Sequence, residues 1–171
     1  MLSDSLLPII IINTLGASDS AYFYIAFAIA NLVYTIAFAI TQVLLAETAN
    51  DEKRFGERAR KGMLIAFGLL TPAIILAVFA APFLLGLFGD SYASGGLETL
   101  RIMAWSGFFV LAYSFLSFYY KHTKRLLPNI VMTAVNAVSI LVLSIILVPT
   151  YGLPGVGWAW LFGTIIAVLV G

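Results

Sequence analysis

The sequence predicts an all-α membrane protein, a single bundle of six transmembrane segments. The first observation is composition: 62% of the 171 residues are hydrophobic and only 10% are charged, with a mean hydropathy of +1.05. Soluble domains carry about 25% charged residues. The second is that polar runs divide the chain into long apolar stretches. The third is that the basic residues gather in two of those polar runs.

One domain over residues 1–171 is expected, because no polar stretch is long enough to fold separately. A helix crosses a bilayer's hydrocarbon core with about 20 apolar residues. The predicted spans cover residues 6–15, 21–45, 62–88, 99–120, 126–148 and 154–171.

The first and last predicted spans are short. Even from Met1, the first reaches only about 22 Å, against a hydrocarbon core of about 30 Å. A re-entrant first segment and a tilted last one would account for this. We favour truncation, in which both are the inner parts of helices on a longer parent chain.

The basic residues predict the orientation of the bundle. Five of the nine lie in the polar run 47–61, and three more lie in 121–125 beside His122. Short loops rich in Lys and Arg stay in the cytoplasm. The turns around 16–20, 89–98 and 149–154 then face outside and contain neither residue type. We therefore expect a multi-pass protein of the plasma membrane with both termini cytoplasmic.

Small residues recur at every fourth position of the last predicted span. Such rows let helix backbones approach closely in lipid, where hydrophobicity does not drive helices together. The row predicts tight helix packing and is Gly155, Ala159, Gly163, Ala167 and Gly171. A looser row in the third span is Gly62, Ala66, Ala73 and Ala77.

Three predicted spans also have polar positions on one helix face. Polar groups within a span usually turn away from lipid, toward the bundle or a hydrated cavity. Hydrogen bonds between helices would explain each residue singly. Three such stripes together favour a shared cavity, with Asn31, Thr35, Gln42, Tyr113, Thr133 and Asn136 as candidate lining residues.

Several function classes lack the residues they need. No charged residue occurs in 21–45, 63–88, 102–120 or 126–171, so an intramembrane proton relay has no carboxylate or histidine. Glu98 and Arg101 are expected to form a surface ion pair. The chain has no cysteine and no recognisable nucleophile–base or metal-binding pattern. We expect no enzyme activity, cofactor or metal, and no nucleic-acid partner.

Three runs carry a family resemblance in the right order. They are TLGASDSAYFYIAFAIANLVYTIAFAITQVLLAE (14–47), AAPFLLGLFGDSYASGGLETLRIMAWS (80–106) and LVLSIILVPTYGLPGVGWAW (141–160). They resemble hairpins of the oligosaccharide and polysaccharide flippases, in the multidrug/oligosaccharidyl-lipid/polysaccharide exporter superfamily. In those proteins a helix ends in a Pro-x-x-Gly turn and the next helix begins at once.

The resemblance implies a two-lobed transporter of twelve to fourteen helices around a central cavity. The chain is similar to the second lobe, beginning inside its first helix. Its implied partners are membrane lipid, a lipid-linked oligosaccharide, and a missing N-terminal lobe or a second copy of the chain. The basic residues that often hold a lipid diphosphate are not visible in the spans. Two alternatives stay open: half of a multidrug exporter, and a non-transporting scaffold subunit.

Overall fold

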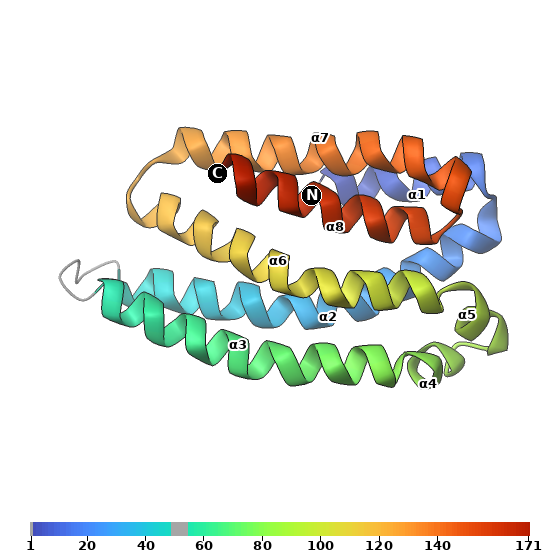
Figure 1. Ribbon diagram of the computed structural model, residues 1–171, viewed down its shortest axis with the longest axis horizontal. Coiled ribbons are helices and arrows are strands. Elements are labelled where there is room, and N and C mark those ends of the chain that lie inside the picture. Colours follow the sequence, from blue (N-terminus) through green and yellow to red (C-terminus); the bar gives the residue numbers. More distant parts are fainter. Residues whose placement is uncertain (1, 49–54) are drawn as a thin grey trace.

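The computed structural model describes residues 2–48 and 55–171, and these are helical with no strand among them (Figure 1). The elements are α1 (Leu2–Thr14), α2 (Ala17–Thr48), α3 (Phe55–Phe79), α4 (Ala81–Gly86), α5 (Asp90–Gly95), α6 (Leu97–His122), α7 (Leu126–Tyr151) and α8 (Pro154–Val170).

Four described helices, α2, α3, α6 and α7, are long and apolar enough to cross a membrane. Helix α8 is apolar but has 17 residues, and α1 has 13. The all-helical membrane class is therefore confirmed, whereas six complete spans remain a prediction.

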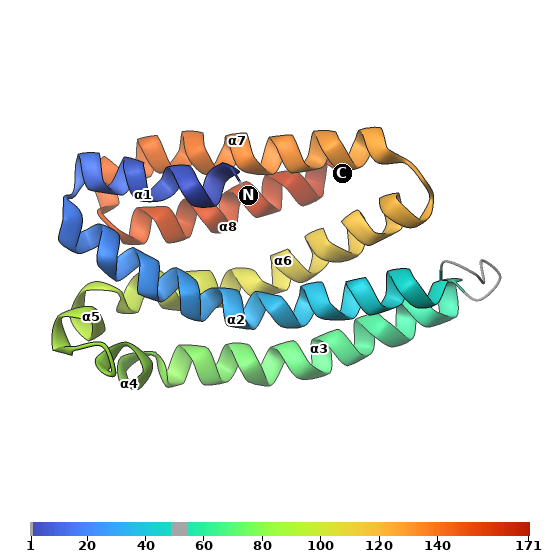
Figure 2. The same cartoon turned by 180° about the vertical axis from the view of Figure 1, so that it is seen from behind.

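Helix α6 is the central element of the bundle. It contacts α2 and α8 extensively and α3 to a lesser degree, but it touches α7 much less. Helix α7 packs mainly on α8, and α1 lies against α7 and α2 (Figure 2). The bundle thus consists of an α2–α3 side and an α1–α7–α8 side, joined through α6.

In the core, the two sides of the bundle are connected by a buried pair of aromatic rings and by the hydrogen bonds of a tyrosine hydroxyl. The ring of Tyr34 on α2 stacks on Trp160 of α8 at a centroid distance of 6.3 Å. Its hydroxyl lies 2.7 Å from Ser106 Oγ and donates to the Met103 carbonyl at 2.7 Å. Ser106 is therefore a buried hydrogen-bonding residue of the core.

The small-residue row of α8 packs as predicted. Its members from Gly155 to Ala167 are buried, and α7 and α8 form the most extensive helix pair described. A Cβ added at Gly163 would lie 2.5 Å from Ile140 Cγ1, and one at Gly155 would lie 2.6 Å from the Leu147 carbonyl oxygen. Only glycine permits this approach of the two backbones.

Three expected boundaries are corrected. The predicted third span, 62–88, is divided at Ala80 into α3 and α4, with Pro82 in the first turn of α4, where its missing N–H breaks no helical bond. The predicted loop 89–98 contains α5. Helix α3 starts at Phe55, so the described part of the polar run 47–61 is largely helical, as its Arg, Lys and Glu content allows.

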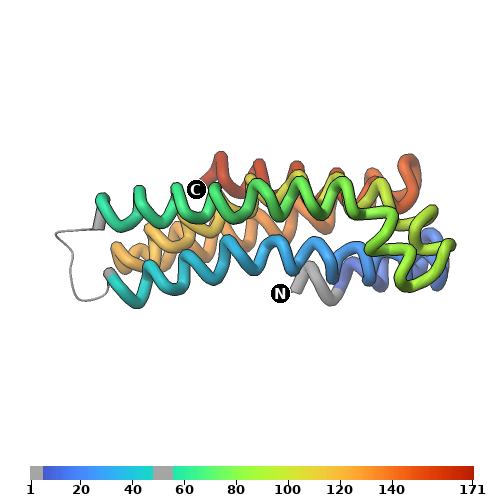
Figure 3. The backbone as a smooth tube through the Cα atoms, turned by 90° about the horizontal axis from the view of Figure 1, so that it is seen from below, coloured from blue at the N-terminus to red at the C-terminus, as the bar shows by residue number. Residues whose placement is uncertain are grey.

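The helix ends and turns that were predicted to lie on the same side of the membrane lie together at the same end of the bundle. The C-terminal end of α2, the N-terminal end of α3 and the α6–α7 link lie at one end, and the α1–α2, α4–α5 and α7–α8 turns lie at the other (Figures 1 and 3). Gly16 and Gly152 make two of these turns with φ of 101° and 64°, which glycine adopts without strain. Which end faces the cytoplasm stays a prediction.

Candidate functional site

A cleft of about 310 Å³ lies where α2, α6 and α7 come together, toward the end with the basic residues. We call it the polar cleft. Its lining side chains are Phe38, Thr41, Gln42, Leu45, Tyr113, Ser114, Ser117, Phe118, Lys121, Asn129 and Thr133.

Helical spacing explains why these residues meet. On α6, Tyr113, Ser117 and Lys121 follow one another at intervals of four, so they share one face. On α7, Asn129 and Thr133 have the same spacing. Because α6 and α7 are packed less closely than other neighbours, their polar faces line a space rather than a closed contact.

Two hydrogen bonds cross the polar cleft between α6 and α7. The Tyr113 and Thr133 hydroxyl oxygens lie 3.0 Å apart, and Ser117 Oγ donates to Asn129 Oδ1 at 2.8 Å. Thr133 also donates to the Asn129 carbonyl at 2.8 Å. These bonds fix the side chains in position at the wall of the cleft.

The charge on the cleft wall is of one sign, positive. The described residues that line the cleft offer hydroxyl and amide groups, the ammonium of Lys121 and three apolar side chains, and none of them has a carboxylate. Such a surface can exchange hydrogen bonds with a neutral polyhydroxyl group and can attract an anion. It offers no charged partner to a cation.

Three of the six predicted cavity residues line the polar cleft: Gln42, Tyr113 and Thr133. Asn31 and Thr35 lie farther along α2, outside it, and the Thr35 hydroxyl donates to the Asn31 carbonyl at 2.8 Å. Asn136 is half-buried one turn beyond Thr133, and its Oδ1 has no hydrogen-bond partner among the described residues.

Sequence reasoning missed Lys121 as a cleft residue. We assigned it to a loop, whereas it occupies the last turn of α6 on the same face as Ser117. The repeated four-residue spacing from Tyr113 to Ser117 and from Ser117 to Lys121 was the signal that could have identified it.

Arg101 also differs from its predicted role. It does not pair with Glu98 among the described residues; its Nε donates to the carbonyl of Val78 at 3.3 Å, in the last turn of α3. This contact satisfies a carbonyl that the helix leaves without an internal partner.

No group of three or more His, Cys, Asp or Glu residues in the described parts of the chain is arranged to hold a metal ion.

The family is decided by comparison with known proteins. The family model described as MatE matches residues 2–150, which is most of the chain. The chain belongs to the MatE family. It is therefore a member of the multidrug/oligosaccharidyl-lipid/polysaccharide exporter superfamily, a group of membrane transporters. No curated protein and no solved structure matches the chain.

The helical architecture is consistent with the transporter family to which the chain belongs. A helical bundle whose polar side chains gather in a cleft suits a membrane transporter. Membership in the family leaves the transported compound open, since the superfamily includes exporters of drugs and of lipid-linked sugars.

Proposed function

We propose that this MatE chain is one lobe of a flippase that moves lipid-linked oligosaccharide or polysaccharide precursors across the plasma membrane, with the polar cleft as its part of the pathway. The observation that carries this proposal is the lining of the cleft: hydroxyl and amide groups with one lysine and no carboxylate.

The lining suits both parts of such a substrate. Sugar hydroxyls donate and accept hydrogen bonds, as do Gln42, Ser117 and Thr133 on the three surrounding helices. A phosphate linking sugar to lipid would lie at the end of the cleft, near Lys121. Phe38 and Phe118 supply apolar surface for the faces of sugar rings or for the lipid.

The lack of acidic residues favours this substrate class over organic cations. An exporter of cationic drugs needs a negative charge in the membrane to replace the solvation lost by its substrate. The polar cleft has none, and neither do the apolar stretches of the sequence. Half of a multidrug exporter is therefore the second candidate.

The lobe is expected to work with a partner, either a first lobe or a second copy of the chain. Alternating access in transporters built from repeats comes from one repeat rocking against another around a shared site. The polar cleft supplies one wall of such a site. We also propose that the end with the basic residues faces the cytoplasm, following the positive-inside rule.

Substrate class can be tested by binding to the purified chain in detergent. We expect saturable binding of a fluorescent lipid-linked oligosaccharide and no saturable binding of a fluorescent organic cation. The variant Lys121→Gln should weaken oligosaccharide binding, whereas the matched variant Lys124→Gln, outside the cleft, should not. Preference for the cation would support the multidrug alternative, and binding of neither would favour a scaffold role.

Dependence on a partner can be tested by transport. The chain is reconstituted in liposomes at a protein-to-lipid ratio that gives single copies, and in parallel as a tandem fusion of two copies. We expect no flipping by single copies. Flipping by the fusion would identify a half-transporter that pairs with itself, and flipping by single copies would contradict the one-lobe proposal.

A further inference from the structure

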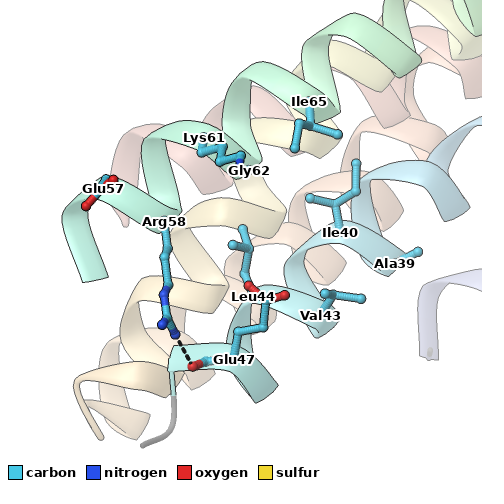
Figure 4. Close-up of a pocket in the computed structure, with 10 residues that line it drawn as sticks. All are labelled: Ala39, Ile40, Val43, Leu44, Glu47, Glu57, Arg58, Lys61, Gly62 and Ile65. Carbon is cyan, nitrogen blue, oxygen red and sulfur yellow. Dashed lines mark hydrogen bonds between the residues drawn. The ribbon is translucent and has the colours of Figure 1, made fainter. Parts of the chain in front are cut away.

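A second and larger groove, of about 800 Å³, lies between the C-terminal part of α2 and the N-terminal part of α3 (Figure 4). We call it the α2–α3 groove. Its lining shares no residue with the polar cleft, so it requires its own explanation. It lies on the α2–α3 side of the bundle, near the end with the basic residues.

The two helices are held together at the groove by a close contact and a hydrogen bond. A Cβ at Gly62 would lie 2.4 Å from Leu44 Cδ1, so glycine allows α3 to pack directly on Leu44. The Arg58 side chain crosses the space between the helices and donates to the Glu47 carbonyl (Figure 4). These two contacts therefore define the shape of the groove between α2 and α3.

Each wall of the groove changes from charged to apolar over one helical turn. On α3, Glu57 is followed four residues later by Lys61, and Lys61 four residues later by Ile65. On α2, Val43 lies four residues before Glu47. Four residues correspond to about 6 Å along the helix axis. The charged groups thus lie near the helix ends, and the apolar groups lie deeper in the membrane.

The apolar part of the groove is open to its surroundings. Val43 is 56% exposed and Ile65 is 47% exposed, on the surface of two helices that are long enough to span the membrane. In a bilayer this surface meets hydrocarbon chains. A ligand there must therefore combine a charged end with an apolar tail, as a lipid does.

The charges distinguish between lipids. Arg58 and Lys61 supply two positive groups, and Glu47 and Glu57 supply two negative groups. An anionic headgroup would be attracted by the first pair and repelled by the second. A zwitterion with a phosphate and a primary ammonium matches both signs, and its ammonium can donate hydrogen bonds to carboxylates, which a quaternary ammonium cannot do.

We propose that the α2–α3 groove binds one phosphatidylethanolamine molecule from the leaflet at the basic end of the bundle. The phosphate lies at Lys61 and Arg58, the ammonium lies at Glu57 and Glu47, and an acyl chain follows Val43 and Ile65. The site is independent of the compound that the polar cleft transports.

Native mass spectrometry of the intact chain tests this proposal. The detergent-purified protein is mixed in turn with phosphatidylethanolamine, phosphatidylcholine and phosphatidylglycerol of identical acyl chains, and the fraction carrying one lipid is measured. We expect phosphatidylethanolamine to be retained about fivefold more than either other lipid, as a few surface-exposed charged contacts allow.

Paired variants identify the groups involved. Glu57→Gln should abolish the preference for phosphatidylethanolamine over phosphatidylcholine, and Lys61→Gln should lower retention of both lipids. The matched controls Glu98→Gln and Lys124→Gln lie outside the groove and should change neither value. Equal retention of all three lipids by the unaltered chain, a preference for phosphatidylglycerol, or an unchanged preference in Glu57→Gln would each overturn the proposal.

Discussion

The hydroxyl oxygen of Tyr113 on α6 lies 3.0 Å from that of Thr133 on α7, across the polar cleft. Thr133 has a single hydroxyl proton and directs it to the Asn129 carbonyl at 2.8 Å. Tyr113 is therefore the donor in the bond between α6 and α7. This leaves the Tyr113 oxygen as an acceptor on the cleft wall, available to a ligand hydroxyl.

The first prediction concerns this bond. Tyr113→Phe should change stability in detergent by only about 0.6 kcal/mol, the average for a hydrogen bond between membrane helices. It should nevertheless weaken binding of a lipid-linked oligosaccharide, because the ligand loses an acceptor. Thermal unfolding and ligand titration measure the two effects. Tyr119→Phe, on the exposed side of α6, is the control and should bind normally.

The second prediction is that the polar cleft is hydrated. Single cysteines at Gln42 and Thr133 should react with a membrane-impermeant thiol reagent in proteoliposomes opened to both sides. Val131, two residues from Thr133 and 46% exposed, does not line the cleft. A cysteine there should react slowly because lipid covers it. Equal reaction rates at Thr133 and Val131 would contradict a hydrated cleft.

The third prediction concerns helix packing. Gly163→Ala should destabilise the bundle by about 1–3 kcal/mol through overpacking against Ile140. Gly68 on α3 has no atom near its would-be Cβ, so Gly68→Ala is the matched control. That control should be neutral or stabilising by up to about 1 kcal/mol, since alanine favours a helix. Similar melting temperatures for the two variants would show that the contact at Gly163 is loose.

The fourth prediction concerns orientation. Ser94 on α5 and Thr123 directly after α6 are both exposed. Helix α5 and the C-terminal end of α6 lie at opposite ends of the bundle (Figure 1). In intact cells, an impermeant thiol reagent should label a cysteine at Ser94 and should leave one at Thr123 unlabelled. The reverse result would place the basic end outside.

Much of the fold could be predicted because membrane helices leave strong signals. Apolar length located the four helices that are long enough to cross a membrane, and the small-residue row of α8 identified its packing face at Gly163. Helix starts and stops were less predictable. Pro149 did not end α7 before Tyr151, and Pro82 lies in the first turn of α4, since the position of a proline within a helix decides its effect.

The candidate site was predicted only in part because helical phase gives the face of a residue but not its depth or its neighbour. Gln42 and Asn31 belong to one stripe on α2, yet only Gln42 reaches the level where α6 and α7 leave space. Lys121 was predicted to lie in a loop because the apolar run ends at Tyr120, whereas α6 continues to His122. The α2–α3 groove depends on how two helices pack against each other, and this packing cannot be predicted from the sequence of either helix alone.

The most direct test of the central claim is photocrosslinking of the chain in liposomes with a lipid-linked oligosaccharide that carries a photoreactive group on its sugar. A substrate pathway through the polar cleft should give crosslinks on the cleft-lining faces of α6 and α7, around Tyr113 and Thr133, and the variant Gln42→Leu should reduce them. Crosslinks confined to the outer face of α3, with none in the cleft and no effect of Gln42→Leu, would contradict it.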